Sequence, residues 1–236
     1  MRKAFDFALQ LLFPRRCPVC DRIVTPFGEQ ICTECIPKLP PLAPPWCMRC
    51  GKKLLKEEPL CEACRKEEPV FVRGRAVYDY RGAVLPIYRF KYGGRREYAD
   101  FFGRQTALYL GEYIKGTGAE ALIPVPLHKK RFRTRGYNQA YEYAKAISRY
   151  TGIPVRKDLL KRVKNTVPMK LLSPLQRQNN LKKAFIVPSN EVKLDKVMLV
   201  DDIFTTGATV NAAARVLKAA GASEVTFVTL SAGTGV

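Results

Sequence analysis

The sequence lacks a long hydrophobic run. No stretch approaches the roughly 18 consecutive apolar residues of a membrane-spanning helix, and the apolar opening at Ala4–Phe13 is interrupted by Asp6 and Gln10. The opening continues into Pro14 without the small-residue cleavage site of a secretory signal peptide. We therefore expect no membrane span, a short amino-terminal helix that packs on its own protein, and a cytoplasmic location.

Acidic residues and histidine are also scarce. The 236 residues contain 21 Asp and Glu against 41 Lys and Arg, which gives a formal net charge of +20. Eight cysteine thiolates on two zinc ions would lower the charge only to about +16. A polyanion is then the first partner to consider. His128 is the only histidine and has no Ser or Cys nucleophile beside it, so catalysis by an imidazole base is not expected.

Cysteine is absent after residue 64, and the eight cysteines before it form four CxxC pairs separated by eleven, eleven and ten residues. Two such pairs supply the four sulfur ligands of a tetrahedral zinc ion. The pattern predicts two structural zinc sites in series, one with Cys17, Cys20, Cys32 and Cys35 and the other with Cys47, Cys50, Cys61 and Cys64. A cross-braced arrangement, in which the first pair shares a site with the third, fits the same spacing. Disulfides are the weaker alternative in a chain without a secretion signal.

The chain changes character near Pro69. Residues 1–69 are predicted to form a double zinc ribbon, in which the five prolines of residues 37–46 make a stiff connector or, alternatively, a polyproline ligand. Residues 70–236 alternate strand and helix patterns, typical of an α/β fold. We expect strands at 70–80, 121–126 and 196–200, and helices at 95–113, 139–150 and 210–220.

The most informative segment connects the last of these strands to the last helix. It reads Asp201-Asp202-Ile203-Phe204-Thr205-Thr206-Gly207-Ala208-Thr209. A Thr- and Gly-rich loop before a helix presents backbone N–H groups and the helix dipole to a phosphate. The two carboxylates suit hydroxyl donors, so a ribose 5-phosphate satisfies the whole segment. No Gly-Lys-Ser/Thr follows, and the spaced glycines of a dinucleotide fold are absent.

This segment resembles the diphosphoribosyl motif of type I phosphoribosyltransferases, which has four apolar residues, two acids and a Thr/Gly loop. The resemblance implies a mostly parallel sheet flanked by helices and a site for 5-phosphoribosyl-1-pyrophosphate (PRPP) with Mg²⁺. Asp201 and Asp202 would be the catalytic pair and hold the ribose hydroxyls. The remaining PRPP contacts would come from Ile203, Phe204, Thr205, Thr206, Gly207, Ala208 and Thr209.

Five cations lie within the seven residues Lys129–Arg135. In a phosphoribosyltransferase such a loop would bind pyrophosphate together with Mg²⁺. The spacing of the cations alone fits a DNA phosphate equally well. We predict PRPP contacts from Lys91, Arg133 and Arg135. The nucleic-acid candidates, where cations alternate with aromatic rings, are Lys129, Lys130, Arg131, Phe132 and Arg177. Residues 167–185 are polar enough to form a mobile hood over the site.

Several motifs together resemble the ComF family of bacterial competence proteins, which are similar to phosphoribosyltransferases and often begin with a cysteine ribbon. They are the strand end Ile123–His128, the segment Arg135-Gly136-Tyr137-Asn138-Gln139, Arg177 with Asn180 and Phe185, the segment Arg89–Gly94, and the Asp-Asp loop. The resemblance implies DNA uptake and natural transformation, with handling of single-stranded DNA beside a DNA translocase or other competence proteins.

Three functional classes remain open from the sequence. The first is an enzyme that transfers a ribosyl phosphate to an unidentified acceptor. The second is a catalytically silent DNA-binding or regulatory protein that uses the PRPP site as a sensor. The third is a nucleobase-salvage phosphoribosyltransferase.

Overall fold

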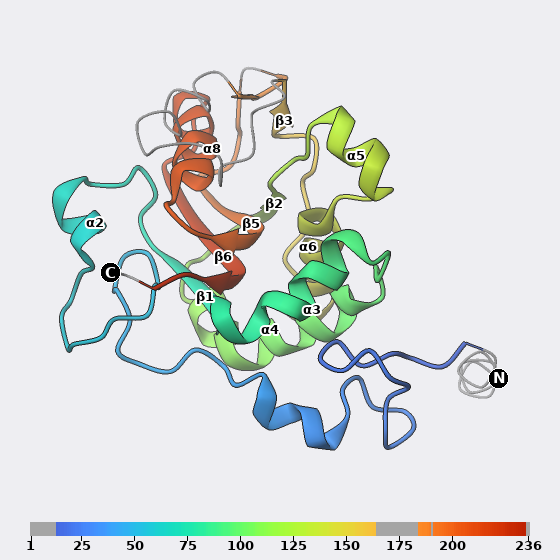
Figure 1. Cartoon of the computed structure of the whole chain (residues 1–236). Coiled ribbons are helices and arrows are strands. Elements are labelled where there is room, and N and C mark those ends of the chain that lie inside the picture. The colour runs from blue at the N-terminus through green and yellow to red at the C-terminus, as the bar shows by residue number, and fades with distance from the viewer. Residues whose placement is uncertain (1–12, 164–183, 190, 235–236) are drawn as a thin grey trace.

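The computed structural model describes residues 13–163, 184–189 and 191–234, and its central feature is a four-stranded parallel sheet (Figure 1). The strands lie in the order β1-β6-β5-β2. Their bounds are β1 Gly74–Asp79, β2 Ala121–Pro124, β5 Lys196–Phe204 and β6 Glu224–Ala232. All three strand pairs are parallel. The expected α/β fold is therefore confirmed.

Helices cover both faces of this sheet (Figure 1). On one face lie α3, α4 and α6, with bounds Tyr80–Tyr92, Tyr98–Lys115 and Gln139–Thr151. On the other lies α8, Ala208–Ala219. The alternation of side chains along β5 explains the two layers. Val197 and Leu199 pack in one core cluster with α8, whereas Met198 and Val200 pack in a second cluster with α3, α4 and α6.

Two small elements border the edge strand β2. Helix α5, Lys129–Arg135, connects β2 to α6, and β3, Lys161–Arg162, forms an antiparallel hairpin with β4, Phe185–Ile186. The residues expected to form the hood lie between β3 and β4, and positions 164–183, including Arg177, fall outside the described residues. The predicted amino-terminal helix falls outside them as well, apart from Phe13.

Four sequence predictions differ from the structure. The strand expected at 70–80 begins only at Gly74 and ends at Asp79, whose carboxylate accepts a hydrogen bond from the Arg81 N–H at 2.9 Å and caps α3. Strand β5 continues through both acids to Phe204, because β6 pairs with it as far as Ala232. The basic segment that was expected to be a loop forms helix α5. This helix begins after His128 and ends where Gly136 adopts a φ of 77°. The proline connector starts with helical turns, since the 3-10 helix η1, Thr33–Lys38, includes Pro37.

The two cysteine ribbons attach to the large domain in different ways. The second, which contains α2, Glu62–Lys66, places Cys47, Cys50 and Cys61 in the same core cluster as α8. The first keeps a small cluster of its own, made of Cys17, Val24, Cys32 and Cys35. Figure 1 shows the first ribbon beside α3 and α4 and the second beside the carboxyl-terminal end. A domain boundary at residues 69/70 stays a prediction.

No helix among the described residues has both the length and the apolar character needed to cross a bilayer.

Candidate functional site

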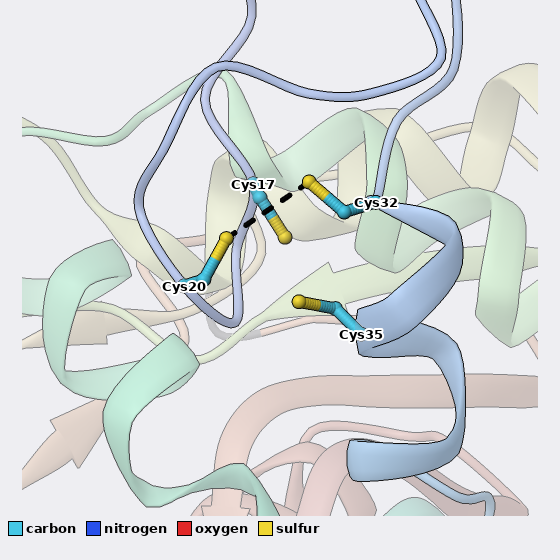
Figure 2. Close-up of side chains that lie close together, drawn as sticks. All are labelled: Cys17, Cys20, Cys32 and Cys35. Atoms are coloured by element: carbon cyan, nitrogen blue, oxygen red, sulfur yellow. Dashed lines mark hydrogen bonds between the residues drawn. The ribbon is translucent and has the colours of Figure 1, made fainter.

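The first four-cysteine cluster has the geometry of a zinc site. The Sγ atoms of Cys17, Cys20, Cys32 and Cys35 all lie within 4.8 Å of one another, and Figure 2 shows the four side chains converging on one point. The Cys20 and Cys32 sulfur atoms are 3.9 Å apart. Tetrahedral zinc with bonds of about 2.3 Å requires sulfur atoms about 3.8 Å apart, so the cluster fits the ion.

The second cluster is equally compact and equally buried. Its sulfur atoms come from Cys47, Cys50, Cys61 and Cys64 and again lie within 4.8 Å of one another. The Cys50 and Cys61 sulfur atoms are 3.7 Å apart. The predicted sequential pairing is thus confirmed, and the cross-braced alternative is wrong. Four sulfur donors leave no coordination position for water or substrate, so both sites suit structural rather than catalytic zinc.

The candidate PRPP site lies at the carboxyl end of β5, beside the end of β2, where the Val125 N–H donates to Val200 O at 2.9 Å. Asp201 and Asp202 are adjacent there, and the Asp202 N–H donates to Asp201 Oδ1 at 2.8 Å. Lys91 Nζ lies 2.8 Å from Asp202 Oδ1, with both side chains about 15% exposed (15% and 14%). Burial, and next the neighbouring charge of Asp202, raise the pKa of Asp201 to about 7.

The chain after β5 turns directly into α8. Thr205 and Thr206 are exposed at this turn. Gly207 has a φ of 79°, and a Cβ atom there would stand 2.9 Å from the Phe204 ring, so glycine is required both by the backbone and by space. The twelve-residue helix α8 begins at Ala208 and directs its amino-terminal N–H groups toward the carboxyl edge of the sheet. The geometry suits a phosphate next to a sugar.

Two of the predicted PRPP contacts have side chains committed to the core. The Phe204 ring stacks on Phe227 with centroids 4.6 Å apart and meets the edge of Phe71. Its carbonyl accepts a hydrogen bond from the Gly233 N–H at 3.0 Å. Ile203 packs against the cluster of α3, α4 and α6. At this turn only the threonines and backbone groups are therefore open to a ligand, and these two side chains are not.

Residues Arg135–Gln139 contact the last turn of α3. The Tyr137 hydroxyl donates to the Phe90 carbonyl, and Gln139 Nε2 donates to the Lys91 carbonyl at 3.3 Å. The Arg135 guanidinium stacks on the Tyr92 ring at 4.6 Å and donates to the Tyr92 hydroxyl at 2.8 Å. Arg135, expected as a PRPP contact, thus holds the helix that carries Lys91. A single sequence gives no signal for the contact between this motif and α3, because the contacting residues lie more than 40 positions apart.

Helix α5 borders a cavity of about 850 Å³. Of the predicted ligands on α5, Lys129, Lys130, Phe132 and Arg133 are exposed, and Arg131 is half-buried. The cavity also contains residues that the sequence reasoning missed, namely Tyr141, Lys157, Lys161 and Arg162. Burial, and then the charge of Arg131, lower the pKa of Arg162 to about 10. The cavity is therefore strongly cationic and contains exposed aromatic surface.

Comparison with known proteins agrees with this architecture. A double zinc ribbon domain model matches residues 8–65, and a phosphoribosyl transferase domain model matches residues 137–234. Competence protein F of Haemophilus influenzae is 35% identical, covering 77% of this chain and 82% of its own length. DNA utilization protein YhgH of Escherichia coli strain K12 is 30% identical (76% and 80% covered), and competence protein ComFC of Bacillus subtilis is 28% identical (85% and 84% covered).

Two zinc-type cysteine clusters, an acid pair at the end of a parallel strand, and relatives that match over most of their length lead to one conclusion. The chain belongs to the ComF family of competence proteins, with a double zinc ribbon ahead of a phosphoribosyltransferase domain.

Proposed function

We propose that the protein binds PRPP with Mg²⁺ at the carboxyl end of β5. The observation that carries the proposal is the acid pair Asp201–Asp202 beside the amino terminus of α8. Carboxylates accept hydrogen bonds from ribose hydroxyls, and backbone N–H groups at a helix terminus bind a phosphate. The hydroxyls of Thr205, Thr206 and Thr209 add further donors.

Mg²⁺ would arrive with the substrate. Among the described residues, the groups of three or more metal-ligating side chains that lie close together are the two cysteine clusters. The acid pair alone is thus too small to enclose Mg²⁺. This agrees with the usual coordination of Mg²⁺ by one or two carboxylates together with substrate phosphates. When bound, the ion would neutralise charge on the pyrophosphate. Lys91 and Arg133 supply further positive charge, and Lys91 would have to share Asp202 with the sugar.

Calorimetry with PRPP and Mg²⁺ tests this proposal. We expect saturable heat with the wild-type protein and at least about a hundredfold weaker binding in the Asp201→Asn/Asp202→Asn double variant. Asp158→Asn is the matched control, because Asp158 pairs with Arg156 on the surface and takes no part in the site. Absence of heat with wild type, or unchanged affinity in the double variant, would refute the site.

We further propose a cytoplasmic role in competence and DNA utilization, with single-stranded DNA contacting the cavity beside α5. The names of the relatives support the role, and the net charge of +20 supports a polyanion partner. Phe132 is 49% exposed and shares the cavity with Tyr141 and Lys157, a combination that suits stacked unpaired bases. The eight described cysteines form no disulfides and group as two sets of zinc ligands, which suits a reducing compartment.

Fluorescence anisotropy with a labelled oligonucleotide tests DNA binding. We expect affinity to fall steeply between 50 and 200 mM salt, by about a hundredfold or more for several phosphate contacts. Phe132→Ala/Tyr141→Ala should weaken binding by about tenfold or more through lost stacking. Lys56→Ala, an exposed lysine of the second ribbon, is the control. A salt-independent affinity would contradict the electrostatic account.

Pyrophosphate release then separates an enzyme from a PRPP-dependent binder. Departure of pyrophosphate leaves a ribosyl cation-like state, so positioning and charge complementarity carry most of the rate, without a visible base. Release that depends on Asp201 and on added DNA or nucleobase indicates transfer chemistry. PRPP binding without release indicates a sensor.

A further inference from the structure

The last turn of α3 is held by the first cysteine ribbon. Arg89 Nη1 donates to the carbonyl oxygens of Pro18 at 3.2 Å and Val19 at 2.6 Å. Pro18 and Val19 are the two residues between Cys17 and Cys20, so their carbonyls belong to the turn that carries one CxxC pair (Figure 2). The position of Arg89 therefore depends on the conformation of this turn.

The corner between α3 and α4 contacts the same turn at further points. The Tyr98 hydroxyl donates to Asp21 Oδ1 at 2.8 Å and also lies 3.2 Å from Cys17 O. Arg95 Nε lies 3.2 Å from Asp21 Oδ1. Tyr98 is 2% exposed, so the hydrogen bond between Tyr98 and Asp21 is partly shielded from water. The ribbon is thus attached to this corner by polar groups at defined atoms.

Lys91 follows Arg89 by two residues on the same helix. Two residues correspond to a rotation of about 200° around a helix axis, so their side chains leave on opposite sides. Arg89 reaches the ribbon, while Lys91 reaches Asp202 Oδ1 at 2.8 Å. The carbonyl of Lys91 is held independently by Gln139. The last turn of α3 therefore links the first cysteine cluster to the acid pair.

We propose that Arg89 is a positioning residue through which the first zinc ribbon sets the Lys91–Asp202 pair. With zinc on Cys17, Cys20, Cys32 and Cys35, the Pro18 and Val19 carbonyls are fixed, and Arg89 holds the turn of α3. Without this contact the turn keeps its core packing through Phe90 and its hydrogen bonds from Tyr137 and Gln139, but it loses its attachment to the ribbon, and Lys91 becomes more exposed. The consequence for PRPP affinity rests on the proposed function, whereas the consequence for Lys91 does not.

The test compares zinc-loaded full-length Arg89→Ala, Arg89→Lys and Arg81→Ala with wild type. Arg81 is the matched control, an exposed arginine in the first turn of the same helix. The first readout is the rate at which an amine-acylating reagent modifies Lys91, followed by peptide mass spectrometry. The second is PRPP affinity with Mg²⁺ by calorimetry, and metal analysis confirms the zinc content of each variant.

In Arg89→Ala we expect acylation of Lys91 to accelerate about fivefold and PRPP affinity to fall about tenfold, as for a lost charge-assisted hydrogen bond. Arg89→Lys should recover part of both effects, because an ammonium can also donate to carbonyls. Arg81→Ala should match wild type. Should Arg89→Ala fail to fold, Asp21→Asn loosens the same turn from the other side and should shift acylation in the same direction by a smaller factor.

Equal acylation rates in wild type and Arg89→Ala, or in Asp21→Asn where that variant replaces it, would overturn the inference. If wild type binds no PRPP, the proposed function fails, but the acylation rates still decide whether Arg89 positions Lys91. If PRPP binds and all variants bind it equally, Arg89 has no role in the site.

Discussion

The two cysteine clusters have the same ligands and nearly the same spacing, yet they occupy different places in the molecule. The second shares a core cluster with Phe71, Phe204 and Phe227, and Lys52 lies 5.8 Å from the centroid of the Phe204 ring. The first has a small cluster of its own and meets the large domain through hydrogen bonds, an ion pair and the packing of Val19 and Ile31 on the cluster of α3, α4 and α6. A structural metal can therefore complete a core in one ribbon and orient a helix in the other.

The acid pair lies where these two arrangements meet. Lys91 approaches Asp202 from the helix that the first ribbon contacts. Phe204, two residues after Asp202, packs in the cluster that includes the second ribbon. Four predictions, ordered from the largest expected effect to the smallest, test this comparison.

The largest effect is expected from loss of a second-ribbon ligand. Cys50→Ser removes a sulfur that is 1% exposed within the main core, so we expect failure to fold or a loss above about 5 kcal/mol. Cys20→Ser in the first ribbon should lose one zinc ion but lower the melting temperature by only about 5 °C. Metal analysis and thermal unfolding measure both. Equal melting temperatures would remove the distinction between the ribbons.

Truncation of the ring beside the second ribbon should come next. Phe204→Ala is expected to cost about 3–5 kcal/mol, because it leaves a cavity between Phe71 and Phe227. Thr205→Ala changes an exposed neighbour and should alter stability by less than about 0.5 kcal/mol, while weakening PRPP binding. Urea unfolding with calorimetry checks the pair. Unchanged stability in Phe204→Ala would show that the packing of this ring contributes little to the free energy of unfolding.

The acid pair should make stability depend on pH. The pKa of Asp201 is raised from 3.8 to about 7, so the folded state holds a proton that the unfolded state has lost, and stability falls as pH rises from about 4 to 7. Asp201→Asn removes this penalty and should exceed wild type by about 1 kcal/mol or more at pH 8, with a smaller difference at pH 5.5. Urea unfolding at both pH values measures it, with Asp158→Asn as control. A difference that grows toward pH 5.5 would contradict the assignment.

A smaller effect than those of Cys50→Ser and Phe204→Ala is expected at the junction of the first ribbon. Asp21 has a φ of 61°, a conformation that asparagine also tolerates, so Asp21→Asn removes the charge without straining the backbone. The Arg95–Asp21 pair is about 30% exposed (29% and 32%), and we expect a loss of about 0.5–1 kcal/mol. Zinc release to a chromogenic chelator should accelerate from the first site alone. Faster release from the second site would show that the ribbons are not independent.

Local patterns in the sequence were sufficient to identify the cysteines of the two clusters and the turn between β5 and α8. A CxxC pair and the segment from Asp201 to Thr209 are each short and continuous, so backbone geometry brings their groups together wherever the chain lies. Hydrophobic periodicity also predicted helices near α4, α6 and α8. It missed α3 because Gly82 and Pro86 interrupt the helical pattern, and it missed β6.

Other features were decided only by tertiary structure. The sequence allowed either zinc pairing, and the folded chain selected the sequential one. Likewise, Arg135 and Phe204 carry residue types that suit a ligand, but they pack on Tyr92 and Phe227. Arg89 meets Val19 across 70 positions, and Lys91 meets Asp202 across more than 100. Which of two equivalent motifs completes a core and which orients a helix depends on such long-range contacts, and these form only when the sheet and its two helical layers assemble.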